Sequence, residues 1–245
     1  MKIASFALSD VGRVRRENQD SSGHFPDRNL FVVADGMGGH KGGKQASEMA
    51  VATIAERLLA GPDSGKLADR TEHLVEAVRD ANRRIVERAS RESELDRMGT
   101  TLVALLLEED EGAIVHVGDS RAYRLRDGEL AQLTTDHTLV ADLLRANEIS
   151  EAEASTHPYR HVLTRALGAA EDVNADVCRL EVRRGDVYVL CSDGVSGMLS
   201  QSEIKTVLSA HANDPEALCR ELIAAANQAG GKDNATAIAV RCAAD

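Results

Sequence analysis

Three strongly apolar runs of this sequence each lead directly into an aspartate, and this recurrence constrains the fold more than any other feature. The runs cover residues 30–34, 113–118 and 187–192, and they are followed by Asp35-Gly36, Asp119-Ser120 and Asp193-Gly194. The mirror case is Asp233-Asn234, which stands just before the apolar run 235–243. A buried strand is a rigid mount, so the short side chains at these strand ends are predicted to point into one shared cleft.

Any single Asp-Gly pair can simply form a turn, because aspartate and glycine are common turn residues. Asp127-Gly128 is best explained in this way, since it separates two short strand-like runs and predicts a hairpin. Several carboxylates converging on one cleft would repel one another unless cations neutralise them. Ligation by oxygen atoms alone suits Mg²⁺ or Mn²⁺ better than zinc.

Hydrophobic periodicity predicts the surrounding elements. Strands are expected at 3–8, 30–34, 100–107, 113–119, 121–128, 129–134, 186–194 and 235–243, and helices at 44–59, 67–89, 139–147, 201–211 and 215–229. The strands cluster in the sequence and the helices come in pairs, which favours stacked antiparallel sheets covered by helices over alternating βαβ units. The polar stretches 9–28 and 148–161 are expected to be a loop and a mobile excursion outside the core.

Composition excludes several classes of function. The 245 residues carry a formal net charge of −11, which disfavours binding to nucleic acid or to an anionic membrane. The N-terminus lacks the apolar stretch of a secretory signal, and no apolar run is long enough to span a bilayer. The four cysteines form no CxxC pair, as expected for reduced thiols. These features predict a cytoplasmic protein made of one domain.

The segment after the strand at 30–34 also offers a competing interpretation. Gly38-x4-Gly43-Lys44 nearly matches a phosphate-binding loop for nucleotides. Residue 45, however, is Gln45 where that motif needs a Ser or Thr hydroxyl, and Asp35 places an acid beside the supposed phosphate site. A metal-binding carboxylate is therefore the better interpretation of this stretch.

Eight motifs occur in order along the chain and together resemble one known family. They are RVRRENQD, FVVADGMGGH, GTTLV, VHVGDSRAYRL, LTTDHTLV, HVLTRALG, VLCSDGVSGML and GKDNATAIAV. This set is similar to the bacterial branch of the metal-dependent protein phosphatases of type 2C, and the similarity runs from about residue 5 to residue 242. It implies an α+β fold, a four-layer α/β/β/α sandwich in which two central antiparallel sheets are flanked by helices. It also implies a single catalytic domain over residues 1–245, with a flap at about 139–165 beside the active cleft.

The resemblance implies a binuclear Mn²⁺ or Mg²⁺ centre with room for a third ion. Asp35 would bridge two ions, the Gly36 carbonyl would be a backbone ligand to one of them, and Asp193 and Asp233 would complete the other. Asp20 would hold metal-bound water. Asp119, together with Asp193, would form the third, looser site.

Other residues of the motifs receive expectations of the same kind. The resemblance implies that Arg15, five residues before Asp20, binds the phosphate, since a guanidinium matches two phosphoryl oxygens; Arg13 and Arg16 are the competing candidates. Met37 stands where animal relatives carry the histidine thought to protonate the leaving group, which leaves His40 and a metal-bound water as candidates for the general acid. The remaining expectations are that His137 and His161 are structural or flap residues, and that Thr164 and Arg165 support the metal site.

The function expected from this resemblance is metal-dependent hydrolysis of phosphoserine and phosphothreonine on proteins by a metal-activated water. The partners would be phosphorylated proteins and the bacterial Ser/Thr kinase that the enzyme opposes, and we expect a monomer that binds neither nucleic acid nor membrane. The alternative is a catalytically silent relative that only captures phosphoproteins or a kinase. Such a protein should lack one of the metal-binding acids, and none is missing from the sequence.

Overall fold

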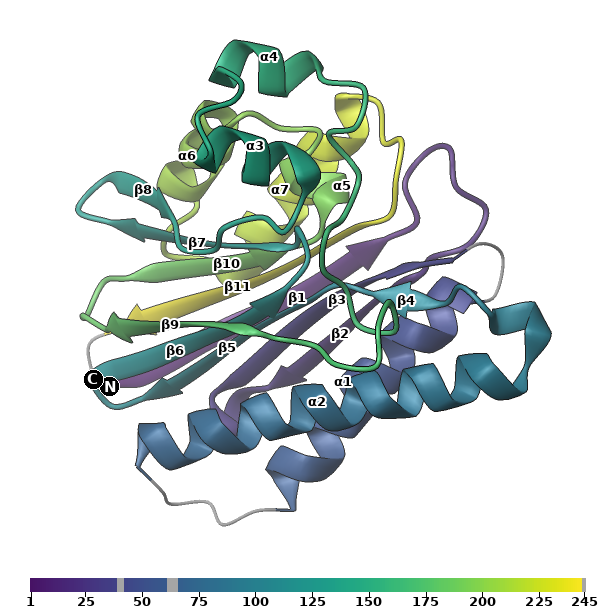
Figure 1. Ribbon diagram of the computed structural model, residues 1–245. Helices are drawn as coiled ribbons and strands as arrows, with labels where there is room; N and C mark the ends of the chain where they lie inside the picture. Colours follow the sequence, from purple (N-terminus) through teal and green to yellow (C-terminus); the bar gives the residue numbers. More distant parts are fainter. Residues whose placement is uncertain (39–41, 61–65, 244–245) are drawn as a thin grey trace.

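The computed structural model describes residues 1–38, 42–60 and 66–243. In this part of the chain two antiparallel sheets stack face to face, and helices cover both outer faces (Figure 1). The predicted four-layer α/β/β/α sandwich is therefore confirmed. None of the described helices is long and apolar enough to cross a membrane.

Each sheet is built from strands that are distant in the sequence. The first sheet has the order β1 (Lys2–Asp10), β11 (Ala235–Ala243), β10 (Val187–Cys191), β7 (Arg121–Arg126) and β8 (Glu129–Gln132). The second has the order β2 (Asp20–Phe25), β3 (Leu30–Met37), β5 (Leu102–Glu108), β6 (Glu111–Val117) and β9 (Asp176–Glu181), and the short β4 (Gly99–Thr100) pairs with β3.

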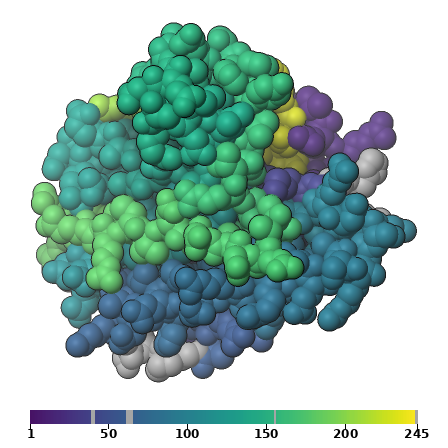
Figure 2. All heavy atoms as spheres, in the orientation of Figure 1, coloured from purple at the N-terminus to yellow at the C-terminus, as the bar shows by residue number. Residues whose placement is uncertain are grey.

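Two groups of helices enclose the sheets. Against the second sheet lie α1 (Gly42–Leu59) and α2 (Leu67–Arg91), and against the first lie α5 (Asp193–Ser196), α6 (Gln201–Ala210) and α7 (Pro215–Gln228). The helices α3 (Leu139–Arg145) and α4 (Glu151–Thr156) form a raised lobe that stands apart from both layers in Figures 1 and 2. Two single-turn 3₁₀ helices, Pro26–Arg28 and Ser93–Leu95, lie in the connections.

The alternation of side chains along each central strand produces three apolar layers. On β3, Leu30 and Val32 face the helices α1 and α2, whereas Phe31 and Val33 face the other sheet. On β10, Val189 faces the helices α6 and α7, and Tyr188 faces the space between the sheets. Both faces of these strands are thus buried, which explains why they appear in the sequence as continuous apolar runs.

The structure corrects three expectations for the polar segments. The expected loop 9–28 contains the strand β2, and the strand β9 was missed altogether. Both strands lie at an edge of the second sheet, where one side stays exposed and the apolar signal is weak. The expected excursion 148–161 contains the helix α4, which begins with a capping box between Ser150 and Glu153 and buries Ala154.

The hairpin prediction and the closing elements are confirmed. Asp127 and Gly128 connect β7 to β8 with positive φ angles of 52° and 76°. The final strand covers the predicted residues 235–243, and it pairs with β1 on one side and β10 on the other. Because β11 is an inner strand, the residues that precede it, Asp233 and Asn234, lie where the strands of this sheet end, away from its outermost strands.

The start of α5, which follows β10, approaches the residue before β11 so closely that only glycine fits at position 194. A Cβ atom on Gly194 would lie 1.9 Å from the backbone oxygen of Asn234. Because the opposing atom belongs to the backbone, it cannot rotate away. This contact places Asp193, which follows β10, and Asp233, which precedes β11, at the same end of these two strands.

We therefore expect Gly194→Ala to lower the free energy of unfolding by about 1–3 kcal/mol, the range for an overpacked buried site. Ser196→Ala, in the same short helix, is the control and should change stability little, because the Ser196 hydroxyl makes only a 3.5 Å contact with the Ser192 carbonyl. Urea unfolding of both variants measures the effect. Equal stability of the two variants would contradict the packing argument.

Candidate metal centre

Four aspartates from separate strand ends line one cavity of about 610 Å³. Asp35 lies near the end of β3 and Asp119 follows β6, while Asp193 begins α5 and Asp233 precedes β11. Asp20 lies behind them and is buried, directly opposite Asp35 in the register of β2 and β3. The structure thus brings all five predicted carboxylates together. The predicted backbone ligand, Gly36, also lines this cavity.

Asp20 is held by two hydroxyl groups. Its Oδ2 accepts hydrogen bonds from Ser192 Oγ at 2.7 Å and from Thr236 Oγ1 at 2.6 Å. Its Oδ1 is buried and has no hydrogen-bond partner among the described residues. Burial, reinforced by the charges of Asp193 and Asp233, raises the pKa of Asp20 to about 7 despite the two hydroxyl groups. A cation or its bound water would satisfy the free oxygen.

Asp35 is fixed through its backbone. Its N–H donates to Thr101 Oγ1 at 3.0 Å, and its carbonyl accepts from Thr101 N–H at 2.9 Å and Thr100 Oγ1 at 2.9 Å. Burial raises the pKa of the Asp35 carboxyl group well above its ordinary value, and the charges of Asp20 and Asp193 raise it further. The carboxylate is therefore firmly held in a position where its charge is costly.

The remaining acids show the same electrostatic conflict. Burial raises the pKa of Asp119 to about 7, with a further contribution from Asp193. The pKa of Asp193 is also raised, first by burial and then by Asp233. Among the described residues that line the cavity, Arg15 is the one arginine or lysine. An all-oxygen set with so little compensating charge fits hard divalent cations.

Arg15 reaches this cavity from the long connection between β1 and β2. Its Nη2 lies 2.6 Å from Asp233 Oδ2, and its side chain remains half exposed. Asn234 holds the same connection in place, because its side-chain amide donates to the carbonyls of Val11 and Glu17 and its Oδ1 accepts from Gln19 N–H. A guanidinium at this position can contact an anion in the cavity.

Sequence reasoning did not single out the residues that position the carboxylates. Ser192, Thr236 and Thr101 hold Asp20 and Asp35 by hydrogen bonds, and Asn234 holds the loop that carries Arg15. The sequence did contain a signal that could have found them. Each is a polar residue at one end of an apolar run, and each lies either within three residues of an aspartate or inside one of the eight motifs. Which acid each would contact depends on the strand order.

The structure does not support the remaining expectations for Thr164, Arg165 and the nucleotide-binding loop. The hydrogen bonds of Thr164 and Arg165 go to the His137 carbonyl, to Asp176 and to the Asn174 carbonyl, and so away from the five acids. His40, the candidate general acid, lies outside the described residues. For the nucleotide interpretation, Lys44 lies 3.5 Å from Glu17, with which it forms an ion pair at the surface. This pairing gives that interpretation no support.

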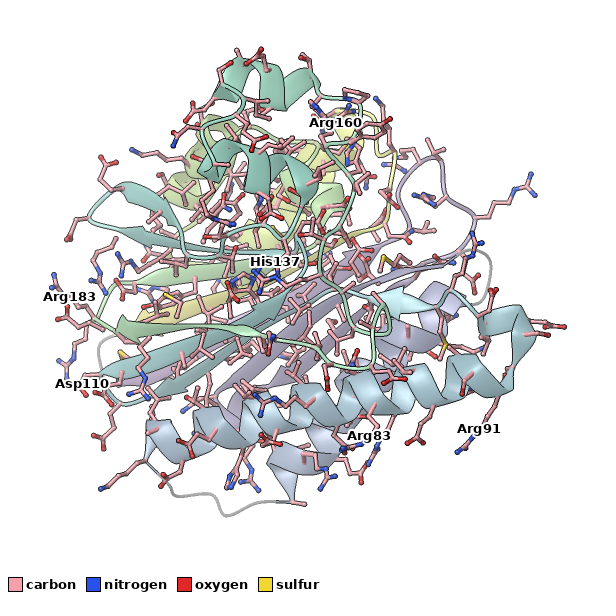
Figure 3. The ribbon with its side chains drawn as sticks, in the orientation of Figure 1. Arg83, Arg91, Asp110, His137, Arg160 and Arg183 are labelled. Carbon is pink, nitrogen blue, oxygen red and sulfur yellow. The ribbon has the colours of Figure 1, made fainter. Side chains whose placement is uncertain are left out.

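A second cavity of about 660 Å³ adjoins the first and is lined in part by the raised lobe of α3 and α4, which Figure 2 shows at the top of the molecule. Asp119, Asp193 and His161 line both cavities. The lobe contributes apolar side chains from α3 and α4 as well as Arg160, which Figure 3 shows on the right-hand side of this lobe, below α4. The predicted flap therefore lies beside the carboxylates.

The raised pKa values predict how stability depends on pH when chelator removes divalent metal. The pKa values of Asp20 and Asp119 rise from 3.8 to about 7, so the folded protein binds protons more tightly than the unfolded chain between these limits. This contribution to stability is complete below about pH 4 and is lost as the pH rises toward about 7.

With chelator, we expect the free energy of unfolding to fall between about pH 5 and about pH 8, on the order of 3 kcal/mol for each group. Urea unfolding at the two pH values measures this change, and adding Mn²⁺ at the higher pH should restore stability. Asp20→Asn should flatten the dependence because it removes one titrating group. A metal-free protein equally stable at both pH values would contradict the carboxylate repulsion.

Comparison with known proteins identifies the family of this chain. The sequence model of the family described as Protein phosphatase 2C matches residues 13–233. The serine/threonine phosphatase stp of Listeria welshimeri is 39% identical over 240 residues, which cover 95% of this chain and 93% of that protein. The crystal structure of the Mycobacterium tuberculosis serine/threonine phosphatase PstP/Ppp is 38% identical with a TM-score of 0.90, and the match covers 99% of each chain.

A further solved structure is the catalytic domain of the phosphatase PstP in complex with two manganese ions. It is 36% identical to this chain with a TM-score of 0.88, and the match again covers 99% of each chain. The matched residues, 13–233, include every aspartate that lines the cavity as well as the lobe of α3 and α4. The chain therefore belongs to the protein phosphatase 2C family.

Proposed function

We propose that this chain hydrolyses phosphoserine and phosphothreonine on proteins in a reaction that depends on Mn²⁺ or Mg²⁺. The observation that carries the proposal is the convergence of Asp35, Asp119, Asp193 and Asp233 on one cavity, with Asp20 behind them. The similar proteins are named serine/threonine phosphatases, and a similar catalytic domain binds two manganese ions. A catalytically silent relative is not favoured, because the full set of acids is present.

The residues of the cavity fit such a metal centre. The donors are carboxylate and carbonyl oxygens, the buried Oδ1 of Asp20 lacks a partner among the described residues, and the pKa values of the acids are raised. In our proposal Asp35, the Gly36 carbonyl, Asp193 and Asp233 would hold two ions. Asp119 together with Asp193 would hold a third. Bound ions of this kind lower the pKa of a shared water and offset charge on phosphoryl oxygens.

The protein itself supplies binding and orientation. Arg15 lies at the rim of the cavity, where its guanidinium can contact two oxygens of a phosphoryl group. Asp20 accepts hydrogen bonds from Ser192 and Thr236 through one oxygen, which leaves the other free to orient water. The hydroxyl of Thr101 accepts the Asp35 N–H and the hydroxyl of Thr100 donates to the Asp35 carbonyl, which fixes the backbone from which the Asp35 carboxylate projects.

The biological setting is part of the same proposal. The substrates are phosphorylated proteins, made by a Ser/Thr kinase that this enzyme opposes, and the protein acts in the cytoplasm as a monomer. Residues 1–245 form one catalytic domain, in which the flap at 139–165 selects substrates. The cavity below α3 and α4 supports this role, because it adjoins the carboxylates and offers both apolar and charged side chains.

Removing one carboxylate charge tests the metal centre. We expect Asp193→Asn to lower kcat/KM for a phosphothreonine peptide by at least about a hundredfold, because a ligand shared by two sites is lost. Folding should be retained, since the buried charge is costly when no metal is bound. The control is Asp127→Asn, which makes the same chemical change in the β7–β8 turn and should keep full activity. Wild-type turnover in Asp193→Asn, or turnover in chelator, would contradict the proposal.

A second variant tests the phosphate-binding arginine. Arg15→Lys keeps the positive charge but loses the paired N–H groups, so KM should rise about tenfold while kcat changes less. The exposed neighbour Arg16 provides a matched control, because Arg16→Lys makes the same replacement one residue away. Steady-state kinetics on a phosphopeptide measures both variants. Equal KM values would remove Arg15 from the binding role.

A further inference from the structure

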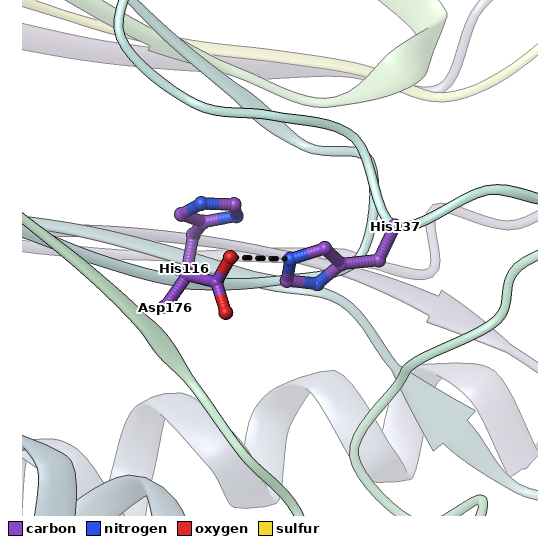
Figure 4. Close-up of side chains that lie close together, drawn as sticks. All are labelled: His116, His137 and Asp176. Carbon is purple, nitrogen blue, oxygen red and sulfur yellow. Dashed lines mark ion pairs between the residues drawn. The ribbon is translucent and has the colours of Figure 1, made fainter. Parts of the chain in front are cut away.

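Outside the metal centre, the described part of the chain contains a cluster formed by His116, His137 and Asp176 (Figure 4). His116 lies on β6, His137 lies between β8 and α3, and Asp176 begins β9. The two histidines are 3% and 1% exposed, and their rings stack with centroids 4.7 Å apart. Ligand atoms of the three residues lie within 4.8 Å of one another, so the first question is whether the cluster binds a metal.

The hydrogen bonds of His137 argue against a metal ion. Its Nδ1 accepts the Gly118 N–H at 3.1 Å, so the single proton of the neutral ring must sit on Nε2. Nε2 carries that proton and so has no lone pair for a cation; it lies 3.2 Å from Asp176 Oδ2, a charge contact without the alignment of a hydrogen bond. Asp176 Oδ1 also accepts from Arg165 at 2.6 Å, and that guanidinium places a positive charge beside the cluster. The cluster is better explained by what His137 connects.

On one side His137 holds the turn that presents Asp119. Its ring accepts the Gly118 N–H, and its own backbone N–H donates to the Gly118 carbonyl at 3.0 Å. Both polar backbone groups of Gly118 are thus bonded to one residue. Gly118 has a φ of +100°, and a Cβ atom there would lie 2.7 Å from Thr101 Cβ. This left-handed turn, fixed by His137, sets the direction in which Asp119 leaves the strand.

On the other side His137 holds the base of the flap. Its carbonyl accepts the Thr164 N–H at 2.8 Å, and the next residue, Thr138, forms a β-bridge with Leu163. Asp176 adds a second connection, because it contacts both His137 and Arg165. Figure 3 shows His137 below the lobe of α3 and α4, level with the sheets. The two ends of the segment 139–165 therefore meet at this residue.

We propose that His137 is a positioning residue that joins the Asp119 turn to the base of the flap, so that the two are held as one unit. This inference rests on the proposed function in one respect, namely that Asp119 is a metal ligand. His137 touches neither substrate nor metal in this account. It acts by orienting the Asp119 carboxylate, and a flap displaced at its base would weaken the metal site that Asp119 serves.

Two substitutions at His137 separate a specific hydrogen bond from general packing. The side-chain oxygen of asparagine can replace Nδ1 as the acceptor for the Gly118 N–H, whereas leucine fills similar space and accepts nothing. We therefore compare His137→Asn with His137→Leu. His73→Leu, on the exposed face of α2, is the control for losing a histidine elsewhere.

Amide hydrogen exchange and manganese binding provide two independent measurements. In His137→Leu, exchange should accelerate in peptides that cover 116–120 and 160–165, and calorimetry should show the weakest manganese-binding step reduced about tenfold. In His137→Asn the Gly118 amide should remain protected, and manganese binding should stay close to that of the wild type. His73→Leu should change neither measurement.

The inference is overturned if His137→Leu behaves like His73→Leu, or if His137→Asn fails as completely as His137→Leu. Stoichiometric Zn²⁺ binding that disappears in His137→Leu but persists in Asp119→Asn would also overturn it, in favour of a metal site at the cluster. If His137→Leu does not fold, long-range ¹H–¹⁵N spectra of the wild type decide: a proton on Nδ1 contradicts the inference, and an unprotonated Nδ1 supports it.

Asp119→Asn distinguishes failure of this inference from failure of the proposed function. If it leaves manganese binding unchanged, Asp119 is not a ligand and that part of the proposed function is wrong, while the exchange data still decide whether His137 holds the turn. If it weakens manganese binding and His137→Leu does not, only the positioning role of His137 is wrong.

Discussion

The structure depends on one electrostatic conflict, the confinement of five carboxylates at the ends of strands in a cleft with little compensating charge. Water would solvate these groups far better than the folded protein does, and the raised pKa values of Asp20, Asp35 and Asp119 report that cost. Bound divalent cations would turn this repulsion into attraction. The fold therefore carries a local instability that metal binding would relieve, which is common where function and stability compete.

The sheets make this arrangement possible because their packed strands prevent the carboxylates from moving apart. β10 and β11 are central strands with both faces packed, and the contact at Gly194 fixes the distance between their ends. Short hydroxyl side chains complete the support, since Ser192 and Thr236 bind Asp20 and Thr101 binds the backbone of Asp35. Preorganisation of this kind lets a site stabilise developing charge without first rearranging.

The flap differs from the sheets in how it is held. The lobe of α3 and α4 has few buried side chains, and its two ends meet beside His137. A lobe attached mainly at its base can vary in sequence and conformation while the carboxylates stay in place. In our proposal, the His137 connection gives such variation a physical route to Asp119, which would couple selection of substrate to occupancy of the metal site.

Much of the fold was predictable, because buried central strands and amphipathic helices have strong periodic signals. The strand 235–243 and the hairpin at Asp127-Gly128 agree with the structure to the residue. The strands β2 and β9 and the helix α4 were missed, since an edge strand or a short surface helix buries too few side chains to leave a pattern.

The sequence by itself determined which chemistry the site could offer, because apolar runs ending in aspartate specify oxygen donors on rigid mounts. Only the tertiary structure decided which of these donors meet. The order of the strands places Asp20 opposite Asp35 and Asp193 beside Asp233, and it turns His137 toward Gly118. Asp20 and Thr236, which share a hydrogen bond, are 216 positions apart, and no local pattern encodes such pairings. They arise from burying both faces of two sheets at once.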